Sequence, residues 1–179
     1  MSKNILVTGS GGIGGVNFVN ALKIAKREYI ISGTDFNKYY LELPNLDSKY
    51  RTPRHTDPKF LEKIKEIIDK DKIDFLHPSP HSEASVIAKE IDQINTATYL
   101  PRYDIIIRDK LQTQEILKRN DVPVAKTETV NSLDEVEPTK EKFKDEKVWV
   151  RMKSGAGGKL SLLCETVEQI QDWIRIWVN

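Results

Sequence analysis

The sequence predicts an α/β fold, with an open parallel sheet in residues 1–104 and a smaller α+β region in residues 105–179. Two observations lead to this prediction. Short β-prone runs alternate with amphipathic helical segments through the first part, an order that pairs strands in parallel through right-handed crossovers. Beyond about residue 105, an amphipathic helix is followed by strand-like runs around a glycine-rich turn. The chain of 179 residues is long enough to bury a core.

Each expected strand of the first part is an apolar, β-prone run, and each expected helix has apolar residues at helical spacing. Asp57 and Pro58 suit the N-cap and the first position of a helix. The elements, in order, are a strand over Asn4–Val7, a helix over Val16–Lys26, a strand over Tyr29–Gly33 ending at Asp35, an irregular excursion over Asn37–Asp57, a helix to Asp69, a strand over Ile73–Leu76 that His77 stops, a helix over Ser82–Asp92 and an edge strand at Tyr99–Leu100.

The second part is expected to contain helices and an antiparallel hairpin. Its elements, in order, are a helix over Arg108–Asn120, a strand over Lys126–Val130, a helix that opens at Ser132 and is interrupted by Pro138, a hairpin of Val148–Arg151 with Leu160–Cys164, and a helix over Val167–Trp177 capped by Thr166.

Composition excludes several function classes. Acidic and basic residues nearly cancel, 27 against 28, so there is no basic surface typical of binding to nucleic acid or to an anionic membrane. The sequence has neither a membrane-spanning apolar run nor a signal-peptide layout. Its single cysteine, Cys164, fits a reducing compartment. We therefore expect a cytoplasmic protein.

A first glycine loop, Gly9-x-x-Gly12-x-x-Gly15, lies between a predicted strand and helix, and Asp35 ends the next strand. This is the layout of a dinucleotide-binding fingerprint and resembles that of NAD(P)-dependent epimerases and reductases. Such enzymes also need a Tyr-x-x-x-Lys pair for acid–base catalysis. None of the 6 tyrosines has a lysine four residues later. The alternative is that the glycines only pack helix against strand.

A second glycine loop follows the run Val148–Arg151. Arg151 can bind phosphate oxygens in a bidentate manner. The backbone N–H groups of Ser154, Gly155, Ala156, Gly157 and Gly158 could surround a polyphosphate, and Lys159 adds a mobile charge. The alternative is an ordinary basic hairpin turn.

The order of segments resembles the ATP-grasp superfamily, and within it proteins similar to the large subunit of carbamoyl phosphate synthetase. The matching segments are Ile5–Gly9 with Gly15–Asn17, Gly33–Asp35, Asp74–Pro78 with Glu83, Asp109-Lys110, Leu117-Lys118, Val122–Val124, Trp149–Arg151 and Gly155–Lys159. The resemblance implies a Rossmann-like pre-ATP-grasp domain over 1–104, then an N-terminal ATP-grasp subdomain over 105–179. It covers the whole chain.

The resemblance also implies site residues and cofactors. Lys110, Arg151 and the second loop would bind the phosphates of ATP, with Mg²⁺ helping to disperse charge while a carboxylate is converted to an acyl phosphate. The first domain would form the acceptor-substrate side. The residues that we place there are Gly11, Gly12, Asp35, His77, Ser79 and Glu83, the last three because they follow the carboxyl end of a strand.

The second ATP-grasp subdomain, which supplies the adenine pocket and the Mg²⁺ ligands, has no counterpart in this sequence. We therefore expect ATP and a small carboxylate or amine substrate as ligands, and either a separate C-terminal subunit or a second copy as partner. Alone, the chain is expected to be inactive or a poor catalyst. No metal site is expected, because Pro78 and Pro80 keep His77 and His81 out of helical spacing. A non-catalytic nucleotide-binding or assembly module stays open as an alternative.

Overall fold

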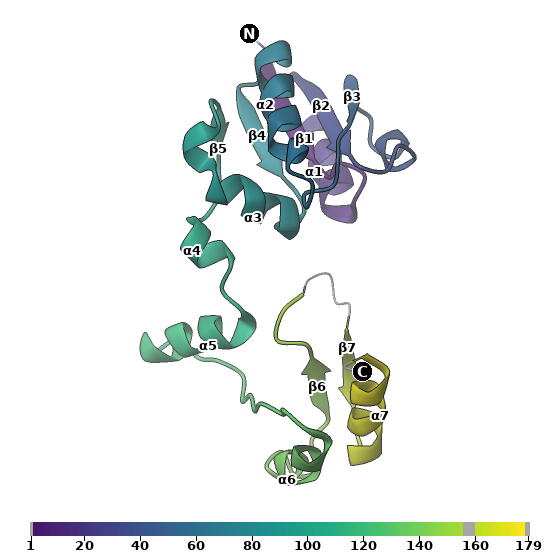
Figure 1. Cartoon of the computed structure of the whole chain (residues 1–179), viewed down its shortest axis with the longest axis vertical. Coiled ribbons are helices and arrows are strands. Elements are labelled where there is room, and N and C mark those ends of the chain that lie inside the picture. Colours follow the sequence, from purple (N-terminus) through teal and green to yellow (C-terminus); the bar gives the residue numbers. More distant parts are fainter. Residues whose placement is uncertain (1, 156–159, 178–179) are drawn as a thin grey trace. The chain divides into compact units, whose positions relative to one another are not determined.

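The computed structural model describes residues 2–155 and 160–177, and the chain divides into two compact units, Met1–Ile107 and Arg108–Asn179. The first unit is a parallel sheet covered by helices, and the second is a smaller α+β unit (Figure 1). This is the fold class that the sequence predicts. Among the described residues, no helix has the length and apolarity needed to span a bilayer.

The first unit has a five-stranded sheet in the order β3-β2-β1-β4-β5, with every neighbouring pair parallel. Its helices and strands, in chain order, are β1 Lys3–Thr8, α1 Ile13–Lys23, β2 Tyr29–Asp35, η1 Tyr40–Glu42, β3 Ser48–Arg51, α2 Lys59–Asp71, β4 Phe75–Pro78, α3 His81–Lys89, η2 Ile91–Gln93, β5 Ala97–Thr98 and α4 Tyr103–Ile106.

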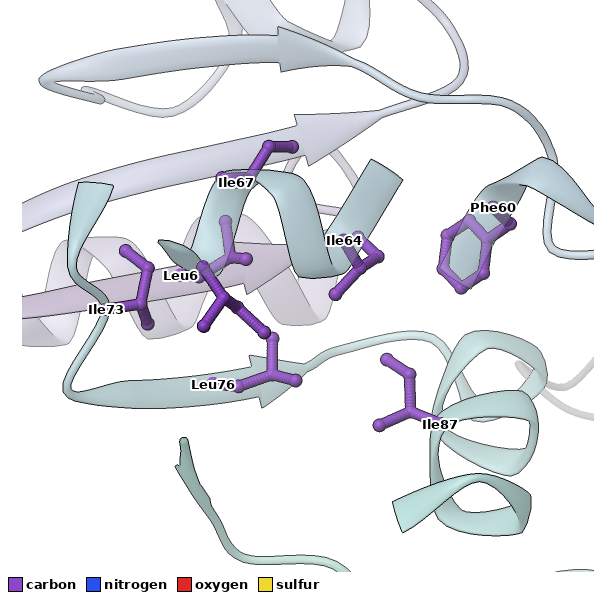
Figure 2. Close-up of a cluster of buried hydrophobic side chains, with 8 residues drawn as sticks. Leu6, Phe60, Ile64, Ile67, Ile73, Leu76 and Ile87 are labelled. Carbon is purple, nitrogen blue, oxygen red and sulfur yellow. The ribbon is translucent and has the colours of Figure 1, made fainter. Parts of the chain in front are cut away.

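Alternating side chains of β1 fill two cores, one on each face of the sheet. Ile5 and Val7 pack with Val19 of α1. Leu6 points to the other face, where it joins a larger cluster from α2, β4 and α3 (Figure 2). That cluster also contains Phe60, Ile64, Ile67, Ile68, Ile73, Leu76 and Ile87. The two cores fix the strands, so the carboxyl ends of β1, β2, β3 and β4 meet at one edge of the sheet.

Five predictions for the first unit are wrong in detail. The first helix, predicted over Val16–Lys26, runs over Ile13–Lys23. The segment 37–57 is not wholly irregular, because it contains η1 and the edge strand β3. The third predicted strand runs on through His77 to Pro78. The predicted helix over Ser82–Asp92 is split into α3 and η2. The last edge strand lies two residues earlier than expected, at Ala97–Thr98, where Thr98 Oγ1 donates to Leu76 O at 2.9 Å.

The second unit contains α5 Lys110–Arg119, η3 Leu133–Glu135, α6 Val136–Glu141, β6 Val148–Arg151, β7 Ser161–Cys164 and α7 Val167–Trp177. Strands β6 and β7 form the predicted antiparallel hairpin. Thr166 Oγ1 accepts from Gln169 N at 3.3 Å, as expected of an N-cap. A small core of Val136, Cys164 and Ile170 holds the hairpin against α6 and α7.

Two predictions for the second unit are wrong. Residues 126–130 form no strand, although Val130 packs on the small core and Glu128 pairs with Lys142 at 2.8 Å. Pro138 does not interrupt a helix, because it is the third residue of α6. In the first turn of a helix, the missing N–H of proline has no intrahelical partner to lose.

Candidate functional site

The first turn of α5 places Lys110 at a fixed position. Asp109 caps this helix: its side chain accepts from Gln112 N at 2.8 Å, and the Gln112 side chain accepts from Asp109 N at 3.0 Å. This reciprocal arrangement is the capping box, which fixes the start of the helix. The backbone hydrogen bond from Gln112, opposed by burial and assisted by Lys153, lowers the pKa of Asp109. The carboxylate is therefore ionised near neutral pH.

Asp109 and Lys110 also hold the entrance to the second glycine loop. Lys153 Nζ lies 3.1 Å from Asp109 Oδ2. Lys110 Nζ donates to Gly155 O at 2.9 Å and to Lys153 O at 3.4 Å. Two segments more than 40 residues apart in sequence thus meet at one ammonium group. Within the described residues this ammonium contacts neutral carbonyl oxygens and forms no ion pair, so its positive charge is available to an anion.

The β-hairpin presents Arg151 and Trp149 on one face. Val148 and Val150 turn inward to the small core, so Trp149 and Arg151 lie on the opposite face. Trp149 is 60% exposed and pairs across the hairpin with Leu163. An aromatic ring and a guanidinium therefore stand two residues apart, roughly 7 Å along one strand face. Trp149 was not predicted as a site residue. Its spacing of two residues from Arg151 along a strand could have placed it on the same face.

The second loop is described only at its beginning. Ser154 and Gly155 are exposed, and Gly155 has a φ of +111°, a conformation suited to glycine. A Cβ added at Gly155 would meet no atom of the described residues within 4 Å. The remaining predicted loop residues, Ala156, Gly157, Gly158 and Lys159, lie outside the described residues.

The first glycine loop is packed against its own chain. A Cβ at Gly11 would lie 2.3 Å from Tyr40 Cβ and Tyr40 O, and one at Gly9 would lie 2.1 Å from Pro80 Cγ. Gly12 is more open, with Gly9 O at 3.4 Å as its nearest neighbour. These glycines are needed because neighbouring segments of the chain approach the loop closely.

The other residues predicted for the acceptor side gather near the carboxyl edge of the sheet. Ser79 Oγ lies 2.9 Å from where a Cβ at Gly14 would be, and Ser79 N donates to Thr8 O at 3.3 Å. His77 stacks on Phe18 of α1, with ring centroids 3.7 Å apart. Burial lowers the pKa of His77. This imidazole is therefore neutral near pH 7.

Glu83 is the most perturbed of these residues. It is 5% exposed, and Asp35 is 4% exposed. Burial raises the pKa of Glu83 to about 7, the nearby charge of Asp35 also raises it, and the Thr8 hydroxyl opposes the shift. Asp35 Oδ1 accepts from Asn37 N at 2.9 Å. The buried Glu83 carboxyl is therefore within electrostatic reach of Asp35, and a carboxyl with so raised a pKa is typical of functional sites.

Comparison with protein-family models and with curated proteins finds no match. Solved structures do match over the chain. The N5-carboxyaminoimidazole synthetase of Staphylococcus aureus, complexed with ADP, is 17% identical over 98% of this chain, with a TM-score of 0.66. The biotin carboxylase domain of the Hydrogenobacter thermophilus 2-oxoglutarate carboxylase, with MgADP and bicarbonate, is 17% identical over 100%, with a TM-score of 0.61.

A third match is the L-amino acid ligase of Bacillus licheniformis, 12% identical over 99% of this chain, with a TM-score of 0.65. These structural neighbours are ATP-grasp enzymes. At such identities the likeness establishes the fold. The chain spans 45%, 40% and 42% of the three matched chains, so it corresponds to less than half of each.

Proposed function

We propose that this chain is the phosphate-binding part of an ATP-grasp ligase, similar to carbamoyl phosphate synthetase. The observation that carries the proposal is the meeting of Lys110 with the entrance to the second loop, at 2.9 Å from Gly155 O. Arg151 stands at the end of the strand that leads into that loop. The fold shared with ADP-bound ATP-grasp enzymes supports a nucleotide as the ligand.

The reaction assigned to the complete enzyme has two steps. A carboxylate oxygen attacks the γ-phosphorus of ATP, which releases ADP and leaves an acyl phosphate. An amine or related nucleophile then attacks the acyl carbon and displaces phosphate. Lys110 and Arg151 would stabilise the negative charge on the phosphates, and Mg²⁺ would do the same when bound.

We propose that further polypeptide completes this site, since the chain spans less than half of each matched structure. Among the described residues, no group of three or more His, Cys, Asp or Glu could hold a metal ion. We assign the Mg²⁺ ligands and the remainder of the adenine pocket to a C-terminal ATP-grasp subdomain, supplied by a separate subunit or by further chain. The first unit, with its carboxyl-edge residues Asp35, His77, Ser79 and Glu83, would face the acceptor substrate.

Trp149 would serve as a platform for the adenine base. The indole is exposed on the same hairpin face as Arg151, at a distance that suits a base stacked on the ring and phosphates bound at the cation. A dinucleotide is a poorer candidate ligand, since Tyr40 already lies against Gly11 at the start of α1. The missing Tyr-x-x-x-Lys pair also disfavours an NAD(P)-dependent epimerase or reductase.

Calorimetric titration with ATP·Mg²⁺ and with NADH tests the proposal. We expect ATP to bind and NADH not to bind. Lys110→Ala should weaken ATP binding about tenfold or more, because a charge-assisted contact is lost. Lys118→Ala, on the exposed surface of the same helix, is the matched control and should bind as the wild type does.

Titration with tripolyphosphate separates the roles of Lys110 and Trp149. Lys110→Ala should weaken binding of both ATP and tripolyphosphate, whereas Trp149→Ala should weaken ATP binding alone. Binding of NADH without ATP would overturn the proposal in favour of the dehydrogenase-like alternative. Binding of neither ligand would favour a non-catalytic assembly module.

A further inference from the structure

Lys153 is a cation at the entrance to the second glycine loop. It lies two residues after Arg151 and directly before Ser154. Its side chain is 62% exposed, and its Nζ lies 3.1 Å from Asp109 Oδ2. The Asp109 side chain is 18% exposed. Lys153 thus stands beside the proposed phosphate-binding residues, with its positive charge compensated by one carboxylate.

The ammonium groups of Lys110 and Lys153 are held near each other by backbone contacts. Lys110 N and Lys110 Nζ each donate to Lys153 O at 3.4 Å. A lysine ammonium lies at most about 8 Å from its own carbonyl oxygen, so the two Nζ atoms are separated by roughly 12 Å at most. A triphosphate, whose terminal oxygens lie roughly 8 Å apart, reaches both when each ammonium approaches within about 2.8 Å. One polyphosphate chain can therefore contact both lysines.

The ion pair of Asp109 with Lys153 can break without disturbing the backbone around it. An exposed ion pair contributes little to stability, because water solvates both charges and the long side chain loses rotamer freedom. Asp109 keeps its place through the helix cap, since its Oδ1 accepts from Gln112 N at 2.8 Å. The backbone of Lys153 keeps its place through the hydrogen bond from Lys110 N. The Lys153 ammonium is therefore free to move to another anion.

We propose that Lys153 is a further phosphate-binding residue, which exchanges Asp109 for a phosphate oxygen when a polyphosphate binds. The proposal rests on the proposed function, because the polyphosphate is the one bound at Lys110. A triphosphate carries several negative charges against the single charge of Asp109, so it attracts the ammonium more strongly. Asp109 competes for Lys153 and also repels the incoming phosphates. Its carboxylate therefore limits the affinity of this site for anions.

The exchange predicts opposite effects for the two members of the ion pair. Lys153→Gln removes the cation and should weaken tripolyphosphate binding about threefold to tenfold. Asp109→Asn removes the competing charge, while asparagine still caps the helix, so the affinity should rise by about the same factor. An ion pair that only held the loop entrance in place would give a loss for both variants, because each breaks the same link.

The test is a calorimetric titration of the intact chain with sodium tripolyphosphate. An ionic strength of about 0.1 M gives a Debye length of about 10 Å, so distant changes of charge are screened. The wild type, the two single variants and the double variant form a double-mutant cycle. We expect a smaller gain from Asp109→Asn when Lys153 is also replaced, because no ammonium is then released.

A second ion pair of the same unit supplies matched controls. Lys142 Nζ pairs with Glu128 Oε2 at 2.8 Å, which joins two segments other than the loop. Lys142→Gln and Glu128→Gln make the same changes of net charge as the test variants. Each should change the affinity for tripolyphosphate less than about twofold, because the changed charge is screened.

Three results would overturn the exchange: weaker binding in both single variants, unchanged binding in Lys153→Gln, or an equal gain from Asp109→Asn with and without Lys153. Circular dichroism melting curves check that the variants fold, and Lys153→Gln, at an exposed side chain, keeps the test valid if Asp109→Asn lowers stability. The nucleotide proposal survives any of these results if Lys110→Ala still weakens tripolyphosphate binding. Absence of binding to the wild type would overturn both proposals.

Discussion

The two glycine-rich loops look alike in sequence but use glycine for different physical purposes. In the first loop, the positions that a Cβ would occupy at Gly9 and Gly11 lie within 2.5 Å of Pro80 and Tyr40 atoms. At Gly155 in the second loop, no atom from the described part of the chain lies within 4 Å of the same position. Glycine permits dense packing in the first loop and an open backbone in the second, while Gly9 (+54°) and Gly155 (+111°) both have a positive φ. A glycine count alone therefore does not identify a ligand site.

The largest expected effect is that of Gly11→Ala on stability. The added Cβ would lie 2.3 Å from Tyr40 O, a backbone atom that cannot move without displacing η1. We expect a loss of roughly 3 kcal/mol or more in the free energy of unfolding, at the upper end of the range for overpacking, because the neighbour is rigid backbone. Urea denaturation followed by circular dichroism measures this loss.

Gly12→Ala is the matched control in the same loop. Its φ of −71° suits any residue, and an added Cβ would meet Gly9 O at 3.4 Å. We expect a change of less than about 1 kcal/mol. Similar losses at Gly11 and Gly12 would mean that the first loop is not packed as described.

Glu83→Gln should produce a pH-dependent stabilisation of about 3 kcal/mol at most. The pKa of Glu83 is raised from 4.5 to about 7 in the folded chain, so its contribution to stability is fully present below pH 4.5. That contribution is lost as pH rises through about 7, at roughly 1.4 kcal/mol per unit of pKa shift. Glutamine stays neutral, so the variant should match the wild type at pH 4 and exceed it at pH 8.

Urea denaturation at pH 4, 6 and 8 checks this prediction. The result also tests the packing of the first glycine loop, because Glu83 lies beside Gly9 of that loop. A carboxyl beside an open, hydrated loop would titrate near its usual pKa. Wild-type and variant curves that stay parallel from pH 4 to pH 8 would show that Glu83 is hydrated, and that the first loop is less packed than its contacts indicate.

The parts of the fold that the sequence predicted are those set by local patterns. β1, β2 and the hairpin are apolar runs, and Thr166 is an N-cap in front of an apolar helix. β3 was missed because its residues Ser48–Arg51 are mostly polar, and Tyr50 is its packed apolar side chain. An edge strand of this kind is defined by pairing with β2, which local sequence does not encode.

The residues of the candidate site also divide into those that local sequence indicates and those that only the folded structure brings out. Lys110 was singled out by the resemblance to ATP-grasp proteins, and the strand before Arg151 was readable from its apolar run. The ion pair of Lys153 with Asp109 was not readable, because it joins two segments that are distant in the sequence. Trp149 was readable in principle, since alternation along a strand places it on the face of Arg151.

The smallest expected effect is that of Gly155→Ala, which probes the open loop. A φ of +111° is strained for alanine by about 1–3 kcal/mol, but no residue that the structure describes packs on this position, so the backbone can relax into another conformation. We expect the free energy of unfolding to change by less than about 1 kcal/mol. The relaxed backbone would move Gly155 O away from Lys110 Nζ, and ATP affinity measured by calorimetry should fall a few-fold. A stability loss as large as that of Gly11→Ala would contradict the contrast between the loops, because it would require close packing around Gly155. Unchanged ATP affinity would instead show that the carbonyl of Gly155 does not position the lysine for phosphate.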